Sequence, residues 1–149
     1  MKDLHELEKQ QYEAKQLRML HHRSIVQYED EFLHIEEGPW RTHYIYIILM
    51  EYCETGDLTD LIREQQLTQF RIMKFFLDIC EGVRYIHSRD IIHRDIKSPN
   101  IFITKGSDEA KLGDFGLCVH GKTIVSKVRH SSAGVVGTNC YMAPELHKG

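Results

Sequence analysis

The chain carries HRDIKSPN at residues 93–100 and, beginning fourteen residues after that stretch ends, DFG at residues 114–116. A long apolar helix is expected before the first stretch, over residues 68–88, from its density of apolar side chains. Two short strands are expected between the two stretches, at residues 101–104 and 110–112. The polar residues of both stretches therefore fall on loops beside strands.

These loops contain the side chains that phosphoryl transfer needs. Asn100 and Asp114 offer amide and carboxylate oxygens, which suit Mg²⁺ together with phosphate oxygens. Lys97 suits a phosphate, and the carboxylate of Asp95 can accept a proton from an attacking hydroxyl. The alternative is a surface ion pair between Asp95 and Lys97 with a turn residue at Asp114. It explains each residue alone but not the whole set.

The two stretches resemble the catalytic loop and the metal-binding loop of the eukaryotic protein kinases. The resemblance implies that Asp95 is the catalytic base and that Lys97 neutralises charge on the γ-phosphate of ATP. Asn100, also in the catalytic set, and Asp114 would hold the Mg²⁺ ions. Arg94 matches an arginine that pairs with a phosphorylated activation segment in many kinases.

The resemblance extends to the nucleotide site. Met50-Glu51-Tyr52-Cys53 looks like a gatekeeper followed by a hinge, in which the backbone of Glu51 and Cys53 meets the adenine edge. Met50 itself and Phe102 are assigned to the same site by the resemblance.

Residues 136–145, VGTNCYMAPE, resemble the end of a kinase activation segment. The resemblance implies that Thr138 forms hydrogen bonds with Asp95 and Lys97, and that Glu145 pairs with an arginine in later helices. A lysine two residues after the catalytic aspartate, with the GTxxY pattern, is typical of serine/threonine kinases rather than tyrosine kinases.

The usual spacing back from Ile25-Val26 places Glu13 at the position of the regulatory-helix glutamate. Phe115 and Gly116 of the DFG stretch are regulatory positions by the same resemblance. The residues expected to stack as a regulatory spine are Leu17, Tyr28, His93 and Phe115.

Within the kinases, HRDIK, NIFIT, LGDFGL and MEYCE resemble the NIMA-related group. Kinases of that group usually carry a phosphorylatable residue four positions before Thr138, whereas this chain has Gly134 there. Ser131 and Ser132 are the nearby candidates for phosphorylation. The ending APE also differs from the SPE that is common in the group.

The remaining pattern predicts the other elements. An amphipathic helix is expected over residues 2–22, with short strands at 25–28 and 44–50 and a loop at 36–39. Residues 55–57 should cap a second, short helix. Beyond Gly113 the chain is expected to be irregular.

In the long helix over residues 68–88, Phe70, Phe75 and Leu77 lie off the main apolar stripe and are expected to face water unless later helices cover them. The main stripe is expected to consist of Ile72, Phe76, Ile79, Cys80, Val83 and Ile86.

The fold class that the resemblance implies is α+β, the central part of a two-lobed kinase fold that is truncated at both ends. Residues 1–149 would form a partial kinase domain, with 1–50 a remnant of the N-lobe, 51–54 the hinge and 55–149 the first part of the C-lobe. No glycine-rich GxGxxG loop and no VAIK-type lysine precede the first helix. Two functions therefore stay open: a serine/threonine kinase that uses ATP and Mg²⁺ on a protein substrate, or a catalytically inactive kinase-like binding module.

Composition excludes several other classes. The 149 residues are 42% hydrophobic and 28% charged, which suits a globular domain, and the net charge of −3 does not favour binding to nucleic acid or to an anionic membrane. The longest apolar run, residues 44–50, is too short to span a bilayer. Four widely spaced cysteines indicate reduced thiols, so we expect a cytoplasmic location, with the nucleus as the alternative.

Overall fold

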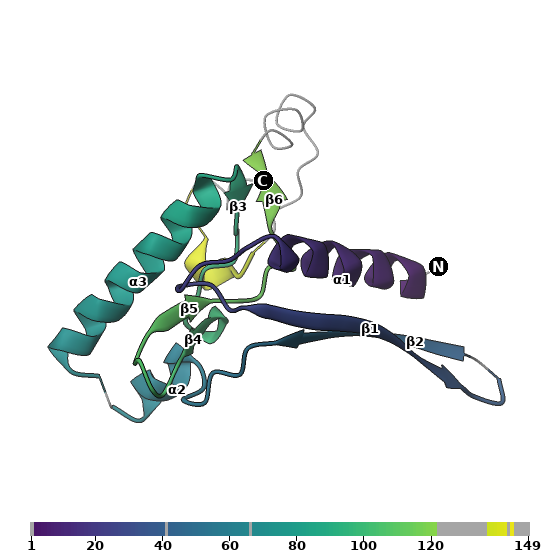
Figure 1. The fold of residues 1–149 in the computed structure, drawn as a ribbon, viewed down its shortest axis with the longest axis horizontal. Coiled ribbons are helices and arrows are strands. Elements are labelled where there is room, and N and C mark those ends of the chain that lie inside the picture. Colours follow the sequence, from purple (N-terminus) through teal and green to yellow (C-terminus); the bar gives the residue numbers. More distant parts are fainter. Residues whose placement is uncertain (1, 41, 66, 122–136, 143, 145–149) are drawn as a thin grey trace.

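The computed structural model describes residues 2–40, 42–65, 67–121, 137–142 and 144. Within these residues, helices combine with small antiparallel two-stranded sheets (Figure 1). In chain order the elements are α1 (Lys2–Arg18), β1 (Tyr28–Glu37), β2 (Thr42–Met50), α2 (Leu58–Arg63), α3 (Gln69–His87), β3 (Ile91–Ile92), the 3₁₀ helix η1 (Ser98–Asn100), β4 (Ile101–Ile103), β5 (Ala110–Leu112), β6 (Val119–His120) and the 3₁₀ helix η2 (Asn139–Tyr141).

Strands β1 and β2 form a long hairpin that lies alongside α1 (Figure 1). Its register runs from Tyr28 opposite Met50 to Glu37 opposite Thr42. The predicted short strand at 25–28 is wrong, because β1 begins at Tyr28 and continues through its acidic residues to Glu37. The loop predicted at 36–39 therefore begins two residues later, at Gly38. Backbone pairing with the apolar β2 fixes this strand, and its carboxylates are exposed except that of Glu31, which is half-buried.

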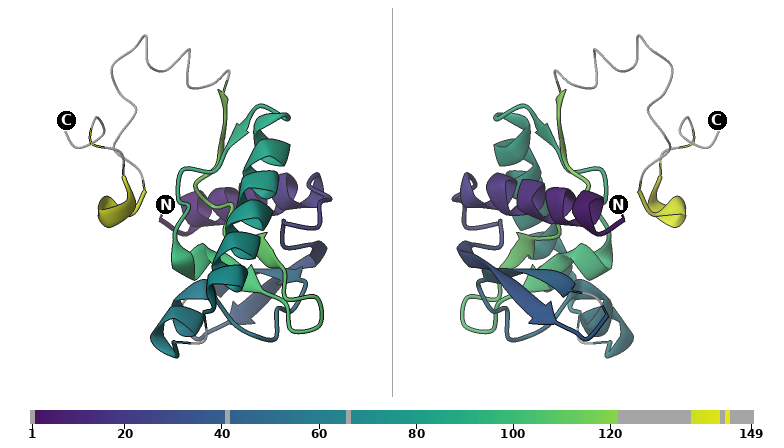
Figure 2. Two further views of the ribbon diagram at one scale, coloured as in Figure 1. Left: turned by 90° about the vertical axis from the view of Figure 1, so that its left-hand side faces the viewer. Right: turned by 90° about the vertical axis from the view of Figure 1, so that its right-hand side faces the viewer.

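Helix α1 ends four residues earlier than the amphipathic pattern predicts. The N–H groups of Met19 and Leu20 donate to the carbonyls of Gln16 and Leu17, three positions back, which tightens and closes the last turn. Helices α1 and α3 run in different directions, and η2 lies to one side of both (Figure 2).

Side-chain caps begin both later helices, and the cap of the short one is as the sequence predicts. The Asp57 carboxylate accepts from the N–H groups of Thr59 and Asp60 at the start of α2, at 2.7 and 3.1 Å. The Thr68 hydroxyl accepts from the N–H of Arg71 at the start of α3, at 3.3 Å. The long helix therefore lies within the predicted range of 68–88.

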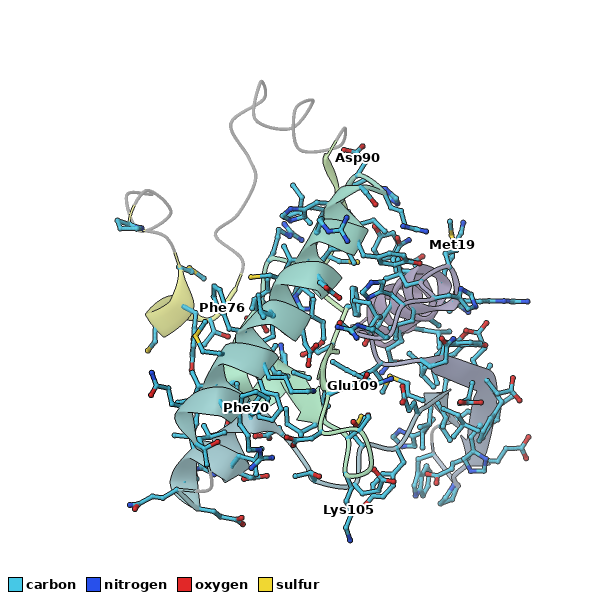
Figure 3. All side chains as sticks on the ribbon, turned by 60° about the vertical axis from the view of Figure 1, so that its left-hand side comes forward. Met19, Phe70, Phe76, Asp90, Lys105 and Glu109 are labelled. Atoms are coloured by element: carbon cyan, nitrogen blue, oxygen red, sulfur yellow. The ribbon has the colours of Figure 1, made fainter. Side chains whose placement is uncertain are left out.

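The buried face of α3 differs from the predicted stripe. Ile72 and Phe76 are exposed, and Phe75, which was expected to face water, is only 2% exposed. Phe70, at 77% exposed, faces water as expected, and Phe70 and Phe76 both project from α3 (Figure 3). The fully buried positions of the helix are Phe75, Asp78, Gly82 and Ile86.

Asp78 lies on the buried face of α3 although it is not part of the predicted apolar stripe, whose members Ile79, Val83 and Ile86 do pack in the core. Its carboxylate is buried, yet it accepts a hydrogen bond from the N–H of Ala110 at 3.1 Å and pairs with Arg23 and Lys74 at 3.2 and 3.3 Å. A carboxylate with three partners is tolerated in the interior. The polar residue therefore lies at the centre of the buried face and joins α3 to β5.

The core lies where α3, the end of α1 and the β4–β5 sheet meet (Figure 1). Close approach is required at Gly82, because a Cβ there would lie 2.8 Å from the carbonyl oxygen of Ser24. The main cluster consists of Leu17, Leu20, Ile25, Leu61, Phe75, Ile86, Ile91, Ile101, Ile103, Ala110, Leu112, Phe115 and Cys118.

The region after Gly113 is less irregular than expected. Strand β6 pairs antiparallel with β3, with His120 opposite Ile91. The N–H of Gly121 also donates to the carbonyl of Asp90 at 2.7 Å. This pairing attaches the chain after DFG to the strand that leads into residues 93–100. Within the described part of the chain, no helix is long and apolar enough to cross a membrane.

Candidate active site

The loop at residues 93–97 holds a backbone conformation that side chains rarely adopt. Arg94 has a φ of 68° and Asp114, in the second loop, has a φ of 57°, both in the left-handed region. Such conformations cost free energy and persist where the surroundings fix them, which is common at functional sites. The Nε of Arg94 donates to the carbonyl of Leu117 at 2.7 Å and helps to fix this loop.

Asp95 is buried at the centre of a polar network. Its Oδ1 accepts from the N–H and the hydroxyl of Thr138, at 3.1 and 2.7 Å. Its Oδ2 lies 2.7 Å from Nζ of Lys97 and accepts from Nδ2 of Asn100 at 3.1 Å. The structure thus brings the three predicted catalytic residues and Thr138 into direct contact.

The same contacts set the ionisation of Asp95. Burial raises the pKa of Asp95, but hydrogen bonds from Lys97, Thr138 and Asn100, with the positive charge of Lys97, outweigh burial and lower it. The carboxylate is therefore ionised at neutral pH. Lys97 also donates to the hydroxyl of Thr138 at 2.8 Å, as the sequence predicts.

His93 joins the two loops through both nitrogens of its ring. Nε2 lies 3.0 Å from the carbonyl oxygen of Gly113, and Nδ1 accepts from the N–H of Asp95 at 3.3 Å. These partners require the neutral tautomer with the proton on Nε2. Burial lowers the pKa of His93, in agreement with a neutral ring. The ring packs against Phe115, with centroids 4.8 Å apart.

The predicted regulatory spine is packed as expected. Leu17 and Phe115 are fully buried in the core cluster, and Tyr28, the first residue of β1, packs against the cluster. His93 joins them through its contact with Phe115. This packing links α1, the β1–β2 hairpin and both loops.

Asn100 and Asp114 have the oxygen atoms that a magnesium site needs. The N–H of Gly113 donates to the carbonyl of Asn100 at 2.9 Å, which places the two loops side by side. Nδ2 of Asn100 is committed to the carbonyl and carboxylate of Asp95, so its amide oxygen is the atom left for a cation. One amide and one exposed carboxylate suit Mg²⁺ when phosphate and water complete its shell. Among the described residues, no group of three or more His, Cys, Asp or Glu forms a cage that could hold a metal by itself.

Glu13 lies against the glycine of DFG. A Cβ on Gly116 would be 3.1 Å from Oε2 of Glu13 and 3.4 Å from Oδ1 of Asp114. The absent side chain at Gly116 therefore makes room for the α1 carboxylate beside the predicted metal ligand. Two of the predicted regulatory positions thus meet.

The predicted hinge leaves β2 after Met50, whose side chain is partly exposed. Cys53 is buried, and burial raises the pKa of its thiol. Its carbonyl accepts from the N–H of Gly56 at 3.1 Å. Its own N–H donates to no acceptor among the residues that the structure describes.

Phe102, assigned to the nucleotide site from the sequence, is half-buried on β4. Its ring lies directly against the backbone of Gly113, because a Cβ at that glycine would be 2.6 Å from Cε2 of Phe102. The ring therefore lies next to the segment that leads into Asp114.

Three of the predicted positions are not placed. Ser131, Ser132 and Glu145 lie outside the described residues, so the phosphorylation sites and the role of Glu145 stay predictions. The pairing of Arg94 with a phosphorylated segment stays a prediction for the same reason.

Sequence analysis missed Gly137 and Lys111. Gly137 has a φ of 128°, and a Cβ there would lie 2.8 Å from the carbonyl oxygen of Arg94. Only glycine fits this approach, which places Thr138 over Asp95. Lys111 is a buried cation in the otherwise apolar β5, and a charge inside a short apolar strand is the signal that could have identified it.

Similar proteins agree with this geometry. The whole chain, residues 1–149, matches the family described as protein kinase domain. The serine/threonine-protein kinase shk2 of Schizosaccharomyces pombe is 39% identical over 127 residues, which cover 85% of this chain and 20% of the relative. The serine/threonine-protein kinase Nek3 of Mus musculus is 39% identical over 137 residues, covering 90% of this chain and 24% of the relative.

The serine/threonine-protein kinase Nek5 of Homo sapiens is 34% identical over 146 residues, covering 96% of this chain and 19% of the relative. The chain thus spans less than a quarter of the length of each of these three relatives. The resemblance to the NIMA-related group is confirmed by the Nek kinases among the relatives. The α+β fold class is confirmed as well, and the chain belongs to the protein kinase domain family.

Proposed function

We propose that the protein containing this chain is a serine/threonine protein kinase, which transfers the γ-phosphate of ATP to a serine or threonine hydroxyl of a protein. The observation that carries the proposal is the network around Asp95, in which Lys97, Asn100 and Thr138 hold an ionised carboxylate. Kinases in general use ATP and Mg²⁺.

Each polar side chain has a role in this reaction. A carboxylate oxygen of Asp95 accepts the proton of the substrate hydroxyl. The same contact orients a lone pair of the hydroxyl oxygen toward the γ-phosphate. Lys97 offsets negative charge near the transferred group, beside the carboxylate it contacts at 2.7 Å. Asn100 and Asp114 would hold Mg²⁺, which supplies charge neutralisation on the phosphate oxygens when bound.

The adenine end of ATP is assigned to the segment after β2. The backbone N–H of Cys53 and the backbone carbonyl of Glu51 are the groups proposed to meet the adenine edge. Phe102 supplies an apolar surface near Gly113. The proposed division of the chain follows from these roles, with 1–50 in the N-lobe, 51–54 as hinge and 55–149 in the C-lobe.

Control of this site is assigned to the contact of Glu13 with Gly116. Because α1 contributes that carboxylate, a movement of α1 changes the surroundings of Asp114. Arg94 and a phosphorylated residue, with Ser131 and Ser132 as candidates, are proposed to fix the segment that ends at Thr138.

The test uses the full-length protein with ATP, Mg²⁺ and a generic protein substrate. Mass spectrometry should find new phosphoserine or phosphothreonine with the wild-type protein and none with Asp95→Asn. Folding of the variant is checked by circular dichroism. A folded wild-type protein that binds a partner but transfers no phosphate would contradict the proposal and support an inactive binding module.

We also propose a cytoplasmic or nuclear location, with neither a membrane nor a nucleic acid as partner. All four cysteines are free thiols, as expected for a reducing compartment. Microscopy of a fluorescent fusion of the full-length protein tests the location, and accumulation in the secretory pathway would contradict it.

A further inference from the structure

An ion pair joins the first residue of the proposed hinge to β5. Nζ of Lys111 lies 2.7 Å from Oε1 and 2.9 Å from Oε2 of Glu51, so it contacts both oxygens of the carboxylate. The Lys111 side chain is 11% exposed and that of Glu51 is 26% exposed. The pair is therefore shielded from solvent more than an ordinary surface ion pair, which contributes little.

Glu51 makes a second connection, to the segment before β1. Its Oε2 accepts from the N–H of Gln27 at 3.1 Å, and its own N–H donates to the carbonyl of Gln27 at 2.8 Å. Residue 51 is thus held to Gln27 by two hydrogen bonds. The carboxylate orients the hinge backbone as well as carrying charge.

The segment before β1 is in turn attached to β5. The N–H of Val26 donates to the carbonyl of Leu112 at 2.9 Å, and the N–H of Leu112 donates to the carbonyl of Ser24 at the same distance. Residues 24–27 therefore lie between the hinge and β5. The Glu51–Lys111 pair adds a direct link between the hinge and β5, which residues 24–27 already connect indirectly.

The hinge and β5 are assigned to opposite ends of the nucleotide. Glu51 begins the segment assigned to adenine, whereas β5 continues through Gly113 into Asp114, the proposed metal ligand. The ion pair thus sets the separation between the backbone that meets adenine and the strand that carries Asp114. A change in this separation weakens the simultaneous contact of ATP with both groups, and so weakens ATP binding.

We propose that Glu51 and Lys111 are positioning residues, which hold the hinge backbone at the distance from β5 that ATP requires. The inference rests on the proposed function, because it assigns adenine to this hinge. Without the lysine, the Glu51 carboxylate keeps only its bond from Gln27 and can turn toward water. The hinge then loses its direct connection to β5 and keeps only the indirect one through residues 24–27.

The experiment compares wild-type full-length protein with Lys111→Met, which keeps the length of the side chain and removes its charge. We expect the KM for ATP to rise about tenfold, with kcat and the KM for the protein substrate changing less than about twofold. Lys111→Arg keeps a cation at this position and should recover most of the affinity for ATP.

Arg71→Met is the matched control. Arg71 pairs with Asp108 at 2.6 Å, between α3 and the β4–β5 turn, and its side chain is 22% exposed. This pair is similarly short and partly buried, but neither residue lies on the hinge. Arg71→Met should lower the melting temperature and leave the KM for ATP unchanged.

A purely structural role gives a different result. If Lys111→Met lowers the melting temperature as Arg71→Met does, with the KM for ATP unchanged, the inference is overturned. If Lys111→Met does not fold, Glu51→Gln takes its place, since its amide oxygen still accepts from Gln27 while the ion pair is lost.

Calorimetric titration with ATP separates this inference from the proposed function. If the wild-type protein binds ATP but transfers no phosphate, the proposed function fails. Weaker ATP binding by Lys111→Met then still supports the positioning pair, and equal binding overturns it. A wild-type protein that binds no ATP overturns both.

Discussion

Thr138 donates two hydrogen bonds to a single oxygen atom of Asp95, one from its N–H group at 3.1 Å and one from its hydroxyl at 2.7 Å. The two residues are 43 positions apart in the sequence, on the proposed catalytic loop and at the end of the activation segment. Their contact means that the placement of this segment directly affects the carboxylate that is proposed to act as the base.

Thr138→Val tests this contact. The valine keeps the shape and the backbone N–H bond but removes the hydroxyl that donates to Asp95 and accepts from Lys97. Loss of one charge-assisted hydrogen bond corresponds to about 1.5–3 kcal/mol, so we expect kcat/KM to fall about tenfold or more. Thr138→Ser retains the hydroxyl and should stay near wild type. Equal rates for valine and serine would show that the hydroxyl does not matter.

Asn100→Ala should affect both stability and the use of Mg²⁺. The buried carbonyl and carboxylate of Asp95 would each lose the donor Nδ2, which costs about 1–3 kcal/mol in the free energy of unfolding. The amide oxygen proposed for the cation is lost too, so more Mg²⁺ should be needed for half-maximal rate. Urea unfolding and a Mg²⁺ titration measure the two effects. An unchanged Mg²⁺ requirement would remove Asn100 from the proposed metal site.

Gly113→Ala should destabilise the fold by overpacking beside the proposed nucleotide site. The new methyl would lie 2.6 Å from the Phe102 ring and 3.2 Å from Val26, and overpacking of this kind costs about 1–3 kcal/mol. Gly106→Ala is the matched control, because nothing lies within 4 Å of its Cβ position. The free energies of unfolding of the two variants, measured in urea, should therefore differ by at least about 1 kcal/mol. Equal stabilities would mean that Phe102 does not pack against Gly113.

Stability should fall as the pH is lowered through the histidine range. Burial lowers the pKa of His93, so below about pH 6.5 the unfolded chain binds a proton that the folded protein does not. The folded protein loses stability as the pH falls from 6.5 toward the lowered pKa, and the loss ends once both states are protonated. A proton on Nδ1 would also oppose the N–H of Asp95.

Urea unfolding of wild type and His93→Gln at a series of pH values checks this expectation. The variant should show a shallower decline below pH 6.5. Burial lowers the pKa of His22 as well, so His22→Asn serves as the control that separates the two contributions. An identical decline in wild type and His93→Gln would contradict the neutral assignment.

The sequence predicted the structure best at motifs in which both the residue types and their spacing are defined. HRDIKSPN predicted the meeting of Asp95, Lys97 and Asn100 on one loop, and the GT motif predicted the contact of Thr138 through its resemblance to the kinase activation segment. The cap at Asp57 was equally clear, since this residue acts on N–H groups within three residues of itself.

Tertiary contacts decided the features that the pattern could not predict. Asp78 is absent from the predicted apolar stripe of α3, and its contacts with Ala110, Arg23 and Lys74 explain its burial. Strand β1 continues to Glu37 because β2 pairs with it, and Lys111 is buried because Glu51 lies opposite. Ala110 and Arg23 are distant in sequence from Asp78, as Glu51 is from Lys111, so local propensity carries no signal for these contacts.

The role of Asp95 as the catalytic base is the central claim, and the kcat of Asp95→Asn tests it most directly. The asparagine keeps the size of the side chain but cannot accept the proton, and general-base catalysis contributes about 10²–10⁴-fold. With full-length protein at saturating Mg²⁺ and ATP, kcat should fall by at least about 10²-fold, while ATP binding measured by calorimetry stays within about threefold of wild type. A kcat within a few-fold of wild type, in a folded variant that binds ATP, would contradict the account.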